Sequence, residues 1–144
     1  MNLQALLDVE ALAFASLLRL RIQWVPPFLV SRRRAWLNSR MLQGVRIVEA
    51  SSLAWVARRI LRGSQMAMVV GHTVHLSGVT RAQFLSDAAW VAHEMAHVLQ
   101  FQRYGTVRFL LLYLLESARR GYHHNRFEVQ AREAAQTLLA PPVR

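Results

Sequence analysis

Two histidines stand four positions apart in the segment WVAHEMAHVLQFQRYG, residues 90–105, and a glutamate follows the first of them. Helical positions four apart are rotated by only about 40°, so His93 and His97 lie one turn apart on the same face. Two imidazoles placed in this way can bind one zinc ion. Glu94 lies beside that face, where its carboxylate can take a proton from a water molecule on the metal. This H-E-x-x-H pattern within a predicted helix therefore indicates a zinc site with a general base.

A catalytic zinc site needs a third protein ligand and one open position. The chain contains no cysteine, so nitrogen and oxygen atoms must supply every ligand. One class of zinc peptidase continues its motif as H-E-x-x-H-x-x-G-x-x-H, but Gln100 and Arg103 stand at those two positions. The third ligand must therefore come from a later part of the chain. The candidates are Glu116, His123, His124, Glu128 and Glu133.

Among these candidates we favour Glu128, which falls in the first turn of the last predicted helix. The need for a third zinc ligand supports this choice. A competing interpretation is that Glu128 completes a capping box with Asn125, because the two residues have the spacing of a helix cap and its third-residue partner. Both roles require the same carboxylate. Glu133 is rotated by about 140° from Glu128 on that helix and is expected to face solvent.

Further residues could act around the metal. Gln100 lies nearly in line with the two histidines on the helix, so it could orient a ligand; the alternative is an ordinary polar residue near the helix end. Tyr122, His123 and His124 lie about one turn before Glu128, and one of them could donate a hydrogen bond to a developing oxyanion. The alternative for the two histidines is a polar loop between helices.

The apolar pattern, together with glycine, proline and capping residues, predicts the elements that position these groups. The expected strands cover residues 45–50 and 65–76. The expected helices cover residues 3–21, 51–62, 86–104, 106–120 and 125–139. This order indicates a mainly helical α+β domain with a short sheet, over residues 44–144. Residues 1–43 then form an N-terminal helical segment that packs on the domain or docks to a partner or a membrane.

The composition excludes a disordered chain, because 53% of the 144 residues are hydrophobic and only 18% are charged. The net charge is +10, and all eighteen basic residues are arginine, most densely in SRRR at residues 31–34. Such arginines could bind nucleic acid or a membrane surface; the compositional bias of a GC-rich genome is the alternative. Asp8 and Glu10 interrupt the first apolar run, so we expect neither a secretory signal nor a transmembrane helix and favour a cytoplasmic location.

The segments AHEMAHVLQFQRYG and GYHHNRFEVQAREAA together resemble the zincin metallopeptidases of the gluzincin kind, in which a glutamate on a later helix completes the zinc site. More narrowly, they resemble small bacterial zincin-like domains, including those attached to extracellular contractile injection systems and the minimal single-domain gluzincins. The resemblance covers about residues 44–139. It implies a zincin-like fold, a zinc ion and peptide-bond hydrolysis, with His93, His97 and Glu128 as the zinc ligands. Glu94 matches the general base of that family.

The resemblance also implies that the strand before the active-site helix is an edge strand, which pairs with an extended peptide substrate. The residues expected to contact the substrate are Val70, Gly71, His72 and Thr73. One position departs from the thermolysin-like pattern, where an aspartate four residues after the ligand glutamate orients the first histidine. Arg132 stands there in this chain, so the support of that histidine must differ.

These expectations combine into one leading function. The chain is expected to be a zinc endopeptidase that hydrolyses peptide bonds by Glu94-assisted attack of zinc-bound water. The alternative is a zinc-binding module without catalysis, which binds a protein partner, nucleic acid or a membrane surface.

Overall fold

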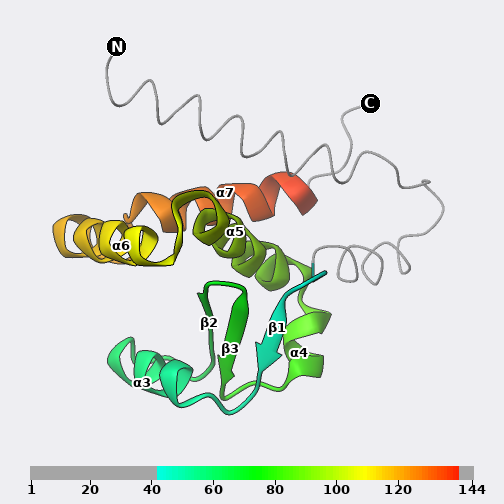
Figure 1. Ribbon diagram of the computed structural model, residues 1–144. Helices are drawn as coiled ribbons and strands as arrows, with labels where there is room; N and C mark the ends of the chain where they lie inside the picture. The colour runs from blue at the N-terminus through cyan, green and yellow to red at the C-terminus, as the bar shows by residue number, and fades with distance from the viewer. Residues whose placement is uncertain (1–41, 140–144) are drawn as a thin grey trace, which may run out of the picture.

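The computed structural model describes residues 42–139, where three strands and five helices follow one another. In chain order they are β1 (Arg46–Val48), α3 (Ser52–Ile60), β2 (Met66–Val70), β3 (Thr73–Ser77), α4 (Arg81–Ser86), α5 (Ala88–Tyr104), α6 (Thr106–Arg120) and α7 (Arg126–Leu139). Helices α5, α6 and α7 lie together above the three strands in Figure 1, and α3 lies below them. The mainly helical content with one small sheet confirms the α+β class. The predicted helix over residues 3–21 and the SRRR segment fall outside the described residues.

The sheet has the order β1-β3-β2, with β1 parallel to β3 and β2 antiparallel to β3. The prediction of one strand over residues 65–76 is wrong, because the chain reverses within it. Gly71 and His72 form a two-residue turn, and Val70 pairs with Thr73 across it. Gly71 has φ 62°, which suits the first central position of such a turn. The strand that immediately precedes α4 and α5 is therefore the central strand β3, and β2 is the edge strand beside it.

The turn also sets which side chains of β2 face the core. Val69 is paired with Val74 on β3, and both are buried in the core. These partners are five positions apart, an odd number, whereas same-face residues of a single strand differ by an even number. Val69 therefore packs in the core, whereas its neighbour Val70 is only partly buried.

Helix α5 carries the H-E-x-x-H motif through the middle of the domain. Asp87 caps its N-terminus by accepting hydrogen bonds from the backbone N–H groups of Ala89 and Trp90, both at 3.0 Å. Gly105, with φ 75°, ends the helix as predicted. Between these ends the helix is buried on most sides, because it packs against β2, α4, α6 and α7. The short helix α4 was not predicted, although Thr80 and Gln83 form a capping box at its start.

Small side chains let α5 and α7 approach closely. Ala96 on α5 and Ala131 on α7 are fully buried and pack together with Ala134 in a small cluster. Alanine presents only a methyl group, so two helix backbones can lie near each other at such a contact. Phe127 anchors the first turn of α7 in the core against Phe109 of α6. This packing brings the start of α7 beside the middle of α5.

The described helices can also be compared with the thickness of a membrane. Within residues 42–139, none of them is both long enough and apolar enough to cross a bilayer.

Candidate metal centre

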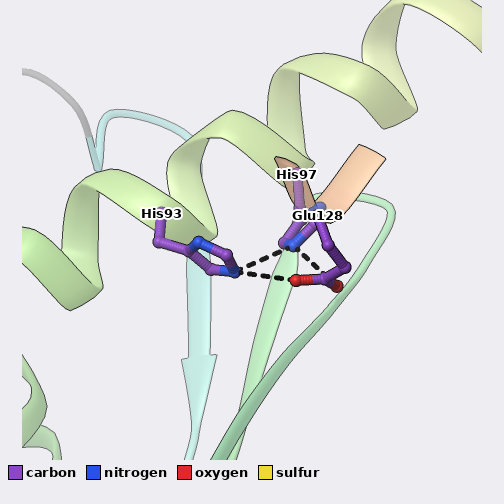
Figure 2. Close-up of side chains that lie close together, drawn as sticks. All are labelled: His93, His97 and Glu128. Carbon is purple, nitrogen blue, oxygen red and sulfur yellow. Dashed lines mark hydrogen bonds and ion pairs between the residues drawn. The ribbon is translucent and has the colours of Figure 1, made fainter. Parts of the chain in front are cut away.

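Three side chains from two helices converge at one point (Figure 2). The Nε2 atoms of His93 and His97 on α5 lie 3.2 Å apart. On α7, the carboxylate of Glu128 places Oε2 at 3.3 Å from Nε2 of His93 and Oε1 at 3.4 Å from Nε2 of His97. The structure therefore brings together the two predicted histidines and the predicted glutamate.

The size of this group can be compared with that of a zinc site. A tetrahedral zinc ion with bonds of about 2.0–2.1 Å holds its ligand atoms roughly 3.3–3.4 Å apart. The separations of 3.2, 3.3 and 3.4 Å are close to that spacing, although they join four atoms, since His93 is nearest Oε2 of Glu128 and His97 is nearest Oε1. All three residues offer nitrogen or oxygen donors, which zinc accepts. One donor atom from each residue lies within 4.8 Å of the other two, so the three side chains could hold one metal ion.

Glu128 does not act as the partner in a capping box. The backbone N–H of Asn125 donates to the carbonyl of Tyr122 at 3.2 Å, and the Asn125 side chain itself accepts from the N–H of Phe127 at 2.9 Å. The Glu128 carboxylate points instead toward the histidines (Figure 2). Its Oε2 atom is buried and makes no hydrogen bond, and it faces Nε2 of His93 at 3.3 Å, so a cation bound between them would satisfy it. Of the two competing roles, the geometry supports that of a metal ligand.

Gln100 determines which ring nitrogen of His97 carries no proton and can bind a metal. The amide nitrogen of Gln100 donates to the carbonyl of Phe127 at 3.1 Å, so its Oε1 must accept. That Oε1 lies 2.9 Å from Nδ1 of His97, which therefore carries the proton. Nε2 of His97 is left with its lone pair directed toward Glu128 and His93. Gln100 is buried and holds a potential ligand in its metal-binding tautomer, as one of its two predicted roles requires.

Tyr113 on α6 also belongs to the site, although the sequence did not single it out. Its hydroxyl donates a 2.6 Å hydrogen bond to Oε1 of Glu128. Burial and the Glu128 charge raise the pKa of Tyr113, so the hydroxyl remains protonated and continues to donate. The only sequence signal was its place four residues after Phe109, on the inward face of the predicted helix.

The residues predicted as oxyanion donors separate into two groups. Tyr122 is 37% exposed, and its partial burial together with the charges of Glu128 and Glu94 raises its pKa. The side chains of His123 and His124 are exposed, in the polar loop that was the alternative interpretation. Arg132, which replaces the expected aspartate, donates to the carbonyl of His123 at 2.6 Å and so ties that loop to α7.

Glu94 lies almost completely buried next to the two histidines, with 3% of its surface exposed. The indole N–H of Trp90 donates to its Oε1 at 3.1 Å. Burial raises the pKa of Glu94, and the neighbouring histidines and the Trp90 hydrogen bond offset only part of this effect. A carboxylate with a raised pKa is suited to taking up and releasing a proton near neutral pH.

Glu128 on α7 and His97 on α5 shift each other's pKa. Burial alone would raise the pKa of Glu128, but the imidazoles of His93 and His97 and the Tyr113 hydroxyl outweigh it and lower that pKa. Burial alone would lower the pKa of His97, but Glu128 and Glu94 raise it. Glu128 is thus held as a carboxylate, the form that binds a metal.

The other predicted residues lie away from the three ligands. Val70, Gly71, His72 and Thr73 form the turn between β2 and β3 instead of the middle of an edge strand. His72 is exposed there, with its Nε2 3.0 Å from the amide nitrogen of Gln102. Glu116 pairs with Arg120 one turn later on α6, and Glu133 is exposed as predicted.

No protein-family model, curated protein or solved structure matches this chain. Its function is therefore inferred from the site itself.

Proposed function

We propose that this protein is a zinc-dependent metallopeptidase. One observation carries the proposal: the Nε2 atoms of His93 and His97, 3.2 Å apart, converge with the Glu128 carboxylate, whose two oxygens lie 3.3 Å and 3.4 Å from them. The buried Oε2 of Glu128 without a hydrogen-bond partner supports the same assignment. When bound, zinc would lower the pKa of a water ligand toward about 7 and polarise a substrate carbonyl.

The residues around the ligands have complementary roles in this proposal. Gln100 keeps His97 in the tautomer that can bind metal, and Tyr113 holds one oxygen of Glu128. Glu94 accepts a proton from the attacking water and returns it to the leaving amine, for which its raised pKa is suitable. Trp90 fixes the Glu94 carboxylate beside the histidines through its indole N–H.

The proposal includes a zincin-like fold for this domain. Its support is the order of the parts: a small sheet, a helix with the H-E-x-x-H motif, and a later helix that presents Glu128 to that motif. We reassign substrate pairing from the turn at Gly71 to β2, because within the described residues β2 is an edge strand of the sheet and it also packs against α5, which carries the motif.

The decisive experiment compares Glu94→Gln with the parent protein. Elemental analysis should find one zinc per chain in both, because Glu94 is not a ligand in this arrangement. Cleavage of a mixed peptide library, read by mass spectrometry, should fall by roughly 10²–10⁴-fold in the variant. Glu133→Gln is the matched control, since Glu133 is exposed on α7 and should change neither result.

Three other results of this experiment would change the proposed function. Equal cleavage by the parent and Glu94→Gln would overturn the mechanism. One zinc per chain without cleavage of any peptide would favour the non-catalytic zinc-binding module instead. A protein that binds no zinc would refute both.

A further inference from the structure

Helix α6 is apolar on the side that faces away from the protein as well as on the side that faces it. Phe109 is buried, and Leu112 and Tyr113 pack partly against the same core. The opposite side carries five large apolar residues with much of their surface exposed. They are Val107 (73%), Leu110 (37%), Leu111 (64%), Leu114 (63%) and Leu115 (49%). We call these five residues the outer stripe of α6.

The outer stripe is continuous. Val107, Leu111 and Leu114 are spaced by four and three positions, so they fall within about 60° of one another on the helix surface. Leu110 and Leu115 flank them on either side. A contiguous exposed apolar patch of this kind usually marks a site that binds a partner, because leaving such a patch in contact with water is unfavourable. In Figure 1, α6 lies at the edge of the layer formed by α5, α6 and α7.

Positive charge borders the stripe. Arg108 and Arg119 are exposed on the side of α6 next to Leu115, and the chain as a whole carries a net charge of +10. Two copies of the protein that met through this stripe would place like charges together along its border, which opposes self-association. An anionic lipid surface satisfies both features, since acyl chains receive the apolar side chains and phosphates pair with the guanidinium groups.

We propose that α6 docks on the surface of an anionic membrane. The helix lies in the plane of the interface, with the outer stripe at the boundary between headgroups and acyl chains and with Arg108 and Arg119 on lipid phosphates. Fifteen residues span only about 22 Å as a helix, so α6 lies on the bilayer and does not cross it. The docked state does not depend on the metal centre, although Tyr113 on the inner face of α6 would bring that centre near the membrane.

The test is co-sedimentation of the full-length protein with vesicles. Vesicles of phosphatidylcholine containing phosphatidylglycerol should bind the protein, and vesicles of phosphatidylcholine alone should bind it much more weakly. Leu111→Ser combined with Leu114→Ser should reduce binding roughly tenfold or more, because two anchoring side chains no longer insert. Ile60→Ser is the matched control, since Ile60 is 73% exposed but lies on α3, and it should bind as the parent does.

A second variant tests the charges. Arg108→Gln combined with Arg119→Gln should remove most of the preference for phosphatidylglycerol and weaken the dependence on salt. Absence of binding to the anionic vesicles would overturn the proposal, as would equal losses for the α6 variant and Ile60→Ser. A marked fall in melting temperature for the Leu111/Leu114 variant would also overturn it, because the stripe would then be covered within the folded chain. Loss of a dimer in sedimentation equilibrium on the same substitutions would assign the stripe to self-association.

Discussion

The hydroxyl of Tyr113 donates a 2.6 Å hydrogen bond to Oε1 of Glu128, and this bond joins α6 to α7 at the candidate metal centre. The contact holds one carboxylate oxygen while the other, Oε2, is buried without a hydrogen-bond partner. A ligand carboxylate held in this way loses less freedom when a metal binds.

Replacing Tyr113 with Phe tests this contact. The ring should keep its packing against Phe109 and Phe127, so the fold should persist. Zinc affinity should fall by roughly 10-fold, within the range found for groups that support a ligand. Competition with a chromogenic chelator measures the change. An unaltered affinity would mean that Glu128 is positioned by its helix alone.

Gln100→Ala should weaken zinc binding by roughly 10–100-fold, because His97 would lose the acceptor that fixes its tautomer. Stability should also fall by about 1–3 kcal/mol, since the buried carbonyl of Phe127 loses its donor. Urea unfolding monitored by circular dichroism measures the second effect. Gln102→Ala, two positions along the same helix, should leave zinc affinity almost unchanged and lower stability less than Gln100→Ala does, because its contact with His72 is exposed.

Glu128→Ala should reduce zinc affinity more than either of these variants, because it removes a ligand itself. Glu133→Ala on the same helix is the control, since its side chain is exposed. Metal content after dialysis against a weak chelator distinguishes the two. Equal zinc retention in both variants would move the third ligand to another residue.

Removal of metal should lower the melting temperature of the parent protein. A ligand that binds only the folded state stabilises it by about 2.7 kcal/mol at a free concentration one hundred times its Kd. Adding zinc to chelator-treated protein should therefore raise the melting temperature by several degrees in differential scanning fluorimetry. Glu94→Gln should keep this rise and Glu128→Ala should lose most of it. A rise in both variants would place the zinc elsewhere.

The close contact of α5 and α7 should also be needed for the metal. Ala131→Leu would force a larger side chain into a fully buried position and cost about 1–3 kcal/mol of stability. Zinc affinity should fall with it, because the two helices must move apart. Gln136→Leu, exposed on α7, should change the free energy of unfolding by no more than about 0.5 kcal/mol. Calorimetry and the chelator assay together check both effects.

Much of α5 and its motif could be predicted from the sequence, because those features are local. The phase of His93 and His97 depends only on the helical repeat, and the limits of the helix follow from Asp87 and Gly105. Local rules failed for the strand predicted over residues 65–76. Alternation continued on both sides of Gly71, so no local pattern revealed that the chain turns back there.

The tertiary structure decided the remaining parts of the site. Sequence spacing allowed Glu128 to be either a helix cap or a metal ligand, and it offered no strong reason to choose Tyr113. The choice depends on contacts between segments far apart in the chain: the alanines that let α7 approach α5, and the packing of Phe127 that sets the first turn of α7. Helical phase is set by neighbouring residues, whereas the meeting of two helices is set by the volumes that fill the space between them.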